Sequence, residues 1–549
     1  MHRNVSNSAR RSPALEAATL CEAFQITAAE RASQVAHRTF GGGVEFTFAE
    51  YAARVQAIAA GLHTLGVGRG DTVALMLVNR PEFNLADMAA VHLGAIPFSI
   101  YNTSSPEQIA QVFLNAQSRV VVTERRFLPN VLAARTPVLE HIVLVDGAEP
   151  GTRALDELAQ RRARGFDFEA AWRAVEPDDV VTLIYTSGTT GPSKAAQLTH
   201  GSVMFESRAL TDVLPLSPGG RGISYLPCAH VGERVVSHYC SSICCGTTVT
   251  SVADHRQIGA ALAELHPTAF GAVPRVWEKL KAGLETAGLS DPSRLPDSAK
   301  AAVRARIGLD QAGWCISGAA PIATDVLRYF DSLGLPLNEG WGMSELSCFA
   351  TMSPRDDIRI GTVGKALPGV QLRVLEDGEL LVRAPLVMKG YRGDPVRTAE
   401  ALDAEGWLHS GDIARIDGDG YVTIVDRKKE IIINSAGKNM SPANIEQQLR
   451  ASSPLIAHAA CIGDRRPYNV ALLVLDTEVS ARYGANEIRA ACGAAVEAAN
   501  ARLSRVEQIK RFAILAADWQ PGGDELTPTS KLKRRVILEK YRSVIEGLY

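Results

Sequence analysis

The sequence Tyr185-Thr-Ser-Gly-Thr-Thr-Gly-Pro-Ser-Lys194 follows an apolar run and precedes a predicted helix near His200. Its glycines let the backbone turn N–H groups inward, its hydroxyls add donors, and Lys194 supplies a positive charge. Such a loop suits phosphate groups, with the lysine available to a departing pyrophosphate. It is not a Walker A loop, because no Gly directly precedes Lys194 and no Ser or Thr follows it. A solvated surface turn can have the same composition, so the stretch alone leaves both interpretations open.

Helix and strand patterns alternate on the N-terminal side of this loop. Thr47 and Glu50 form a capping-box pattern, apolar residues follow at helical spacing to Leu65, and Gly66 ends the run. Strands are predicted at 72–78, 96–100, 120–123, 142–145 and 180–185, and helices at 81–93 and 105–116. This alternation is typical of an α/β fold.

The pattern changes after about Ile360, where short strands and tight turns dominate. Asp377-Gly378 and Asp417-Gly-Asp-Gly420 are predicted to be hairpin turns. Helices are expected to return only at 443–449.

The size and composition of the chain limit the kinds of function that it can have. Its 549 residues exceed the usual size of one domain, so we expect more than one. The 58 basic and 60 acidic residues nearly cancel, which argues against a nucleic-acid partner and favours small-molecule chemistry. The nine cysteines are odd in number and lack CxxC spacing, so they indicate neither a zinc site nor a disulfide framework. A reducing, cytoplasmic location fits this pattern.

Two further segments indicate whether the start of the chain is ordered and whether the protein is secreted or crosses a membrane. The first twelve residues are polar, carry arginines and lead into no apolar region, which argues against secretion. We expect residues 1–30 to form a disordered or poorly ordered tail. The apolar-leaning stretch 235–252 is broken by polar residues and would be a poor membrane span, which leaves peripheral membrane contact open.

Six motifs, in order, relate the chain to a known family. The loop, with Lys194 and the following Leu198-Thr-His200, resembles the phosphate loop of the adenylate-forming superfamily of acyl-CoA synthetases, luciferases and nonribosomal adenylation domains. The other five motifs are Ser317-Gly-Ala-Ala-Pro321, Asn338-Glu-Gly-Trp-Gly-Met-Ser-Glu345, Ser410-Gly-Asp412, Asp426-Arg-Lys-Lys429 and Thr529-Ser-Lys531-Leu-Lys-Arg534. Chance agreement of six ordered motifs is negligible, and the resemblance covers roughly residues 46–538.

The resemblance implies an α/β protein with two parts. The first is a large N-terminal domain of doubly wound mixed sheets with a β-rich subdomain, which binds ATP and the acyl group and is expected over residues 31–425. The second is a small mobile α+β domain, expected over residues 426–549. The hinge is expected near Lys429, where a few backbone torsions would rotate the small domain between two half-reactions.

The resemblance also implies where the nucleotide binds. The residues expected to bind ATP or AMP are Thr186, Ser187, Gly188, Thr189, Thr190, Gly191, Lys194, Gly318, Ala319, Ala320, Asn338, Glu339, Gly340, Trp341, Gly342, Met343, Ser344, Asp412 and Arg427. Trp341, where the family more often has Tyr, would stack on adenine, and Asp412 would accept from the ribose hydroxyls. Glu345 and Ser344 would hold Mg²⁺ against the phosphates. Taken alone, Trp341 would be interpreted as a core aromatic residue.

Three residues are expected to be catalytic: Lys531, His230 and Glu345. Lys531 would place a cation between the substrate carboxylate and the α-phosphate, two anions that must meet. His230 would lie near the carboxylate. The acyl chain is expected to contact Val231, Gly232, Val273 and Gly318. Gly437 would let the pantetheine arm of coenzyme A reach the adenylate.

The predicted substrate is a long-chain fatty acid or a similar apolar carboxylic acid. Segments 224–234 and 273–280 resemble long-chain acyl-CoA synthetases more than activators of acetate, aryl acids or amino acids. The sequence therefore predicts an ATP-dependent, AMP-forming ligase with coenzyme A as the acceptor. Two alternatives stay open, namely a ligase that loads a separate carrier protein and a nucleotide-binding regulator that has lost catalysis.

Overall fold

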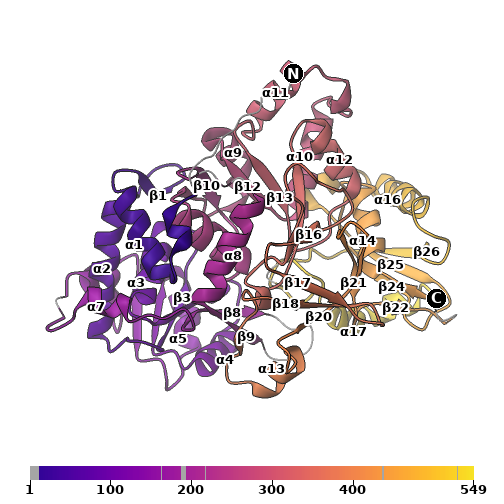
Figure 1. Cartoon of the computed structure of the whole chain (residues 1–549). Helices are drawn as coiled ribbons and strands as arrows, with labels where there is room; N and C mark the ends of the chain where they lie inside the picture. Colours follow the sequence, from indigo (N-terminus) through magenta and orange to yellow (C-terminus); the bar gives the residue numbers. More distant parts are fainter. Residues whose placement is uncertain are drawn as a thin grey trace.

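The computed structural model describes residues 11–161, 163–186, 193–214, 216, 218–435, 438–527 and 530–549. In Figure 1 the N-terminal part, in indigo to magenta, lies on one side, and the C-terminal part, in yellow, lies on the other. Between them lie the orange strands β17 Gln371–Val374, β18 Glu379–Arg383, β20 Leu408–Ile416 and β21 Val422–Arg427. The predicted mixed α/β fold with a large N-terminal and a smaller C-terminal domain is confirmed.

The largest sheet has eight strands in the order β19-β9-β8-β4-β3-β5-β6-β7. These strands are β3 Thr72–Met76, β4 Ile96–Ser99, β5 Val120–Thr123, β6 His141–Leu144, β7 Arg153–Ala154, β8 Val180–Thr186, β9 Lys194–Thr199 and β19 Gly390–Tyr391. Pairing is parallel from β8 through β4 and β3 to β7, and antiparallel for β8 with β9 and β9 with β19. The predicted strands in this region are therefore present within one or two residues.

Helices cover both faces of this sheet, because alternate residues of a strand point to opposite sides. In β3, Val73 and Leu75 pack with helices α2 Phe48–Thr64 and α3 Pro81–Val91. Ala74 and Met76 pack on the other side with α4 Pro106–Ala116. The predicted capping box begins α2.

The sequence does not predict β9, the strand that begins at the end of the 185–194 motif. The sequence predicts a loop that leads directly to a helix, and that helix is present as α8 His200–Val213. Between them, however, β9 turns back antiparallel along β8 and pairs Lys194 with Thr186. Residues 187–192, which lie between β8 and β9 in the sequence, are outside the described residues. The hairpin therefore places Lys194 at the carboxyl end of β8, where ligands of parallel sheets usually bind.

Three smaller sheets complete the N-terminal part. One has the order β10-β11-β1-β2, with β10 Arg221–Ser224, β11 Thr248–Ser251, β1 Val35–Thr39 and β2 Glu45–Thr47. The second has the order β12-β13-β14-β15-β16, with β12 Ala269–Ala272, β13 Trp314–Ser317, β14 Leu337–Trp341, β15 Thr351–Met352 and β16 Lys365–Ala366. The third is antiparallel in the order β17-β18-β20-β21, with β17 Gln371–Val374, β18 Glu379–Arg383, β20 Leu408–Ile416 and β21 Val422–Arg427.

Both predicted hairpin turns are present in the third sheet. Asp377-Gly378 joins β17 to β18, and 417–420 joins β20 to β21. The expectation that helices return only at 443 is wrong, because α13 Pro395–Ala401 intervenes. Its start is encoded locally, since the Asp394 carboxylate accepts from the Arg397 N–H at 2.9 Å and Pro395 opens the first turn.

The predicted tail over residues 1–30 is wrong for its described part, residues 11–30. Helix α1 Leu20–Glu30 begins with Thr19 as its N-cap and buries Leu20, Cys21 and Phe24 completely. The Thr27 hydroxyl donates to the carbonyl of Ile243 at 2.6 Å. The apolar side of this helix is thus part of the main core. The sequence does not predict it because the chain begins with a polar segment. Residues 1–10 lie outside the described residues.

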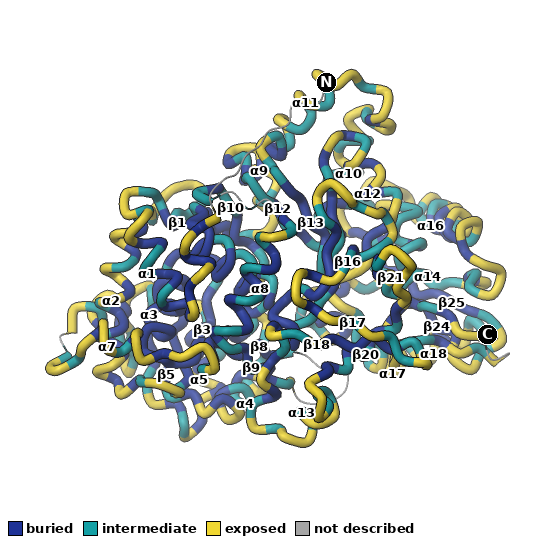
Figure 2. The backbone as a smooth tube through the Cα atoms, viewed as in Figure 1, coloured by how far each residue is buried: buried dark blue, intermediate teal, exposed yellow. Residues whose placement is uncertain are grey.

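The C-terminal part is a three-stranded sheet covered on both faces. Its strands are β24 Ile456–Ile462, β25 Asn469–Leu475 and β26 Ile509–Leu515. Helices α14 Pro442–Ala451 and α16 Ala485–Asn500 pack on one face. Helices α17 Arg534–Lys540 and α18 Arg542–Glu546 pack on the other. Figure 2 shows β3 and β8 of the large sheet and β25 of the C-terminal sheet mostly buried, while the helix α11 Asp297–Arg306 is largely exposed.

The stretch 235–252 does not form a continuous apolar helix. It contributes to η3 Gly232–Cys244, which has π-helical hydrogen bonding, and to β11. Within the described residues no helix has both the length and the apolar character that a membrane crossing requires.

Candidate active site

The phosphate end of the candidate site joins three distant segments. Lys194 lies with its Nζ 4.8 Å from the centroid of the Tyr391 ring, and the Tyr391 hydroxyl donates to Glu345 Oε1 at 2.7 Å. Strand β19 pairs with β9 and so brings Tyr391 next to Lys194, while Glu345 lies in the short helix η6 Ser344–Leu346. Tyr391 therefore lies between Lys194 and Glu345, although the sequence does not predict it as a site residue. The predicted phosphate-loop residues Ser187, Gly188, Thr189, Thr190 and Gly191 lie outside the described residues.

The nucleoside end of the candidate site is centred on Asp412, whose side chain is buried. Its Oδ2 accepts from Trp341 Nε1 at 2.7 Å, and its Oδ1 lies 2.9 Å from Arg427 Nε. Asp412 and Arg427 are direct partners in the register of β20 and β21, and Trp341 ends β14. Three of the six motifs therefore meet at one carboxylate.

Two buried polar atoms near the ends of β13 and β14 point to a ligand. Ser317 and Asn338 are almost fully buried, and in the described part of the chain Ser317 Oγ and Asn338 Oδ1 have no hydrogen-bond partner. Buried polar groups are normally paired, so these two atoms are available to a bound molecule. Ala319, two residues after Ser317, has a φ of 69°, a strained value of the kind that clusters at functional sites.

Close packing requires glycine at two positions of this region. A Cβ on Gly340 would lie 2.8 Å from the Phe349 ring, and one on Gly342 would lie 1.8 Å from the carbonyl oxygen of Cys348. Close packing against the 348–349 backbone and ring therefore demands glycine there. Gly318 is more tolerant, since a Cβ would lie 3.8 Å from Phe349. Burial raises the pKa of Glu339 to about 7.

Lys531 reaches this site from the C-terminal part of the chain. Its side chain keeps exposed surface, but desolvation by the surrounding protein and the charge of Arg427 hold the pKa of Lys531 below its ordinary value. Asp412 and Glu345 act on this pKa in the opposite direction, which shows that both carboxylates lie near the ammonium. The preceding residue, Ser530, has a φ of 60°, a left-handed value that favours glycine.

His230 lies near the same lysine and is held in one orientation. Its Nδ1 accepts from the backbone N–H of Gly232 at 3.1 Å, which assigns the proton of the neutral ring to Nε2. Burial, aided by the charge of Lys531, lowers the pKa of His230 to about 4. The ring is therefore neutral near pH 7 and can donate from Nε2.

The predicted acyl-contact residues fall into two groups. Val273 follows β12 and Gly318 follows β13, and these parallel neighbours end at the same edge of their sheet. The N–H of Gly318 donates to the carbonyl of Ala272 at 3.2 Å, which fixes the two ends together. Val231 and Gly232 instead begin η3 next to His230, with Val231 buried in the main core.

One of the two remaining predicted positions lies at the junction between the two parts. Lys429 is exposed in the turn after β21, between the last N-terminal strand and the first C-terminal one. Gly437 lies outside the described residues. Arg275 in α10 Pro274–Thr286 reaches across the junction, with its Nη2 2.5 Å from Asp476 Oδ2. This ion pair links the N-terminal and C-terminal parts in the arrangement described here.

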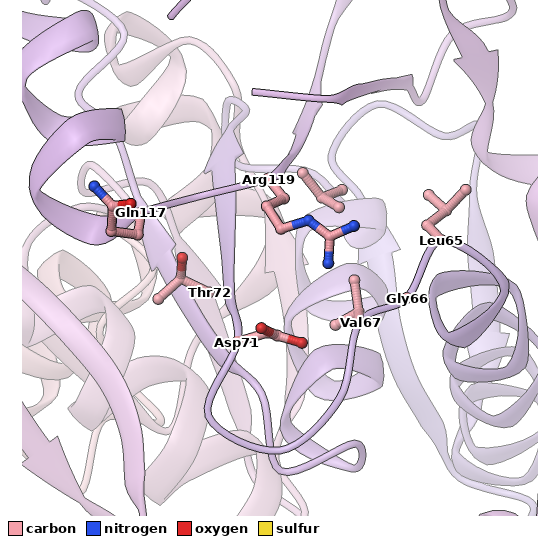
Figure 3. Close-up of a pocket in the computed structure, with 8 residues that line it drawn as sticks. Leu65, Gly66, Val67, Asp71, Thr72, Gln117 and Arg119 are labelled. Atoms are coloured by element: carbon pink, nitrogen blue, oxygen red, sulfur yellow. The ribbon is translucent and has the colours of Figure 1, made fainter. Parts of the chain in front are cut away.

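The N-terminal part also contains a small cavity that lies away from the candidate site. Figure 3 shows a cavity of about 10 Å³ next to Asp71, Thr72 and Arg119, at the amino ends of β3 and β5. This volume is enough for roughly one water molecule. It lies at the opposite end of the strands from Lys194 and takes no part in the site.

Two family matches cover most of the chain. The AMP-binding enzyme family matches residues 24–392, and the AMP-binding enzyme C-terminal domain matches residues 429–549. The two matches together span the segments that carry Lys194, Glu345 and Lys531.

Named relatives and a solved structure agree with these matches. "Putative fatty-acid--CoA ligase fadD11" of Mycobacterium tuberculosis is 49% identical over 451 residues, which cover 73% of this chain and 79% of the relative. "Long-chain-fatty-acid--CoA ligase FadD15" of Mycobacterium bovis is 35% identical over 563 residues, which cover 93% of each. The A-PCP didomain of a carboxylic acid reductase from Segniliparus rugosus, in complex with AMP, shares the fold with a TM-score of 0.81 at 19% identity, over 98% of this chain and 84% of that one. The chain therefore belongs to the AMP-binding enzyme family.

Proposed function

We propose that this protein is an ATP-dependent, AMP-forming acyl-CoA synthetase that activates a long-chain fatty acid or a similar apolar carboxylic acid. The observation that carries the proposal is that Asp412 joins three separate motifs through Trp341 and Arg427. Lys531, from the C-terminal part, is near enough for Asp412 and Glu345 to act on its pKa. The relatives named fatty-acid–CoA ligases support the same reaction and the same class of acid.

In the first half-reaction a carboxylate oxygen attacks the α-phosphorus of ATP, and the bond to pyrophosphate breaks. Lys531 supplies positive charge where the two anions approach, which lowers the electrostatic cost of their encounter. Asp412, held by Trp341 and Arg427, binds the ribose. Lys194 stabilises the charge that develops on the departing pyrophosphate.

The residues at the phosphate end fit a magnesium ion bound mainly by substrate. In the described ranges there is no cluster of three or more His, Cys, Asp or Glu side chains that would hold a metal without substrate. A single carboxylate with phosphate oxygens and water is a common way of binding Mg²⁺. Glu345, oriented by Tyr391, and Ser344 would hold the ion, which when bound neutralises charge on the phosphate oxygens.

His230 and the apolar residues position the acid. The neutral imidazole donates from Nε2 to the substrate carboxylate, because its Nδ1 is engaged with Gly232. The acyl chain lies against Val231, Gly232, Val273 and Gly318, and its burial contributes binding energy that aligns the carboxylate.

In the second half-reaction the thiol of coenzyme A attacks the acyl carbonyl carbon, and AMP leaves. The small domain turns about Lys429 before this step, so the ion pair of Arg275 with Asp476 must break. Gly437 then lies beside the pantetheine arm. We place the enzyme in the cytoplasm, with peripheral contact to a membrane as the route to apolar acids.

The two alternatives are less well supported. Loading of a separate carrier protein uses the same first half-reaction, but the relatives above are named as CoA ligases. A catalytically silent nucleotide-binding regulator would not require Lys194, Glu345 and Lys531 together.

Acid-dependent exchange of labelled pyrophosphate into ATP, measured with a panel of acids, tests the proposal. We expect exchange with long-chain acids and release of AMP when coenzyme A is added. Exchange without AMP release on adding coenzyme A would favour the carrier-protein alternative. No exchange with any acid would rule out the enzyme.

A further inference from the structure

A cavity of about 230 Å³ lies behind the phosphate end of the candidate site. Its walls are α4, the start of β9, and the segment from β19 into α13. These elements gather at the lower edge of Figure 1, where α4, β9 and α13 are labelled. Lys194 and Tyr391, the two residues that connect to Glu345, both line this cavity.

The lining of the cavity is positively charged. Lys194, Arg392 and Arg397 contribute three cations, and Asp394 is the one carboxylate among the described lining residues. Asp394 Oδ2 lies 3.4 Å from Arg397 Nη1, so it offsets one of these charges. The balance of three positive charges and one negative charge suits a small, highly charged anion.

The wall that carries Arg392 is fixed by hydrogen bonds between elements. Arg392 Nη2 donates to the carbonyl of Ala116 at 3.0 Å, and Asn115 Nδ2 donates to the carbonyl of Arg392 at 3.2 Å. The Tyr185 hydroxyl donates to Asn115 Oδ1 at 2.8 Å. The Arg392 side chain is thus held in place before any anion arrives, which lowers the entropy cost of binding.

We infer that this cavity binds inorganic pyrophosphate after it leaves the adenylate. The inference rests on the proposed function, which generates pyrophosphate beside Lys194. Lys194 lies both at the phosphate end of the site and in the wall of the cavity. Its positive charge can therefore attract pyrophosphate at the site and in the cavity. Tyr391 separates the two places, with its hydroxyl on Glu345 and its ring against Lys194.

Adding a negative charge to the cavity wall tests this inference. Gln111 lines the cavity from the exposed side of α4, and Gln111→Glu keeps its size while adding a carboxylate. We expect the KM for pyrophosphate in the exchange reaction to rise about three- to tenfold, with the KM for ATP unchanged. Arg397→Gln removes a cation from another wall and should act in the same direction.

The matched control is Gln56→Glu, which makes the same change on the exposed side of α2. Helix α2 covers the opposite face of the eight-stranded sheet, so the KM for pyrophosphate should stay at the wild-type value. Thermal unfolding of all three variants checks that each is folded. An equal KM for pyrophosphate in Gln111→Glu and Gln56→Glu would overturn the inference, as would an equal rise in the KM for ATP.

Direct binding separates this inference from the proposed function. Calorimetric titration of the wild-type chain with inorganic pyrophosphate should show binding that Gln111→Glu weakens, even without turnover. Orthophosphate should bind more weakly because it carries less charge. If Gln111→Glu instead weakens only coenzyme A, the cavity serves the phosphates of that substrate and the pyrophosphate assignment is wrong.

Discussion

Trp341 donates its indole N–H to the carboxylate of Asp412 at 2.7 Å, so the predicted adenine-stacking residue and the predicted ribose ligand are joined directly. Both side chains are buried, and Asp412 is also paired with Arg427. A tyrosine at position 341 has no N–H to make this bond. The tryptophan therefore orients the carboxylate as well as offering an aromatic face.

Trp341→Phe should raise the KM for ATP about tenfold, because a hydrogen bond to a charged group is worth roughly 1.5–3 kcal/mol and the ring remains. The KM is measured in the pyrophosphate exchange reaction. Trp172→Phe is the matched control, since within the described residues Trp172 Nε1 has no hydrogen-bond partner. If both variants change the KM for ATP equally, the bond to Asp412 has no role in nucleotide binding.

Lys531→Ala should slow adenylation about a hundredfold while leaving thioester formation from preformed acyl-adenylate nearly unchanged. In the proposed mechanism the lysine acts where carboxylate and phosphate meet, and that encounter is finished once the adenylate exists. Single-turnover measurements of the two half-reactions check this, with Lys510→Ala on an exposed position of β26 as the control. Equal losses in both half-reactions would contradict the role given to Lys531.

Tyr391→Phe should weaken the apparent affinity for Mg²⁺ by about tenfold, since residues that orient a metal ligand typically have effects of this size. The ring beside Lys194 is retained, and only the hydrogen bond to Glu345 is lost. The rate of exchange is measured against magnesium concentration. Tyr421→Phe removes a bond of the same length, to the carbonyl of Asp357, and should leave the magnesium dependence unaltered. A wild-type magnesium dependence in Tyr391→Phe would refute this orienting role.

Arg275→Gln should lower the rate of adenylation relative to thioester formation by a few-fold. Its ion pair with Asp476 is partly buried and exists in the arrangement that brings Lys531 to the site, so its loss shifts the population toward other arrangements. The ratio of the two half-reaction rates is the readout. Arg256→Gln, which removes an exposed local pair with Asp254, is the control. An unchanged ratio would mean that the pair does not bias the domain position.

The free energy of unfolding should fall as the pH drops from about 6.5 to about 4. Burial lowers the pKa of His92 to about 4, so the unfolded chain binds a proton in this range that the folded chain does not. This pKa shift of His92 lowers the free energy of unfolding by about 3 kcal/mol across this pH range. Urea unfolding at a series of pH values measures the slope, which should be smaller in His92→Gln than in the surface control His255→Gln. A slope that is the same in both variants would exclude His92 as a source of the pH dependence.

Local patterns were sufficient for most elements of the fold. The capping residues of α2 and the short-range alternation of the parallel strands act over a few residues, so the sequence alone predicts them. Strand β9 was missed because its pairing with β8 depends on the hairpin between them. Helix α1 was missed because its burial depends on η3, more than 200 residues away.

The order and type of the residues are sufficient for the family resemblance and the α/β class, because neither needs three-dimensional information. The roles of Lys194, Glu345, Asp412 and Lys531 are predictions from the same motifs. The contacts of Tyr391 with Lys194 and Glu345, and of Trp341 with Asp412, are visible only in the folded structure. Such contacts link segments tens to hundreds of residues apart, and no local pattern specifies them. Their geometry arises when the sheets and the two parts of the chain pack together.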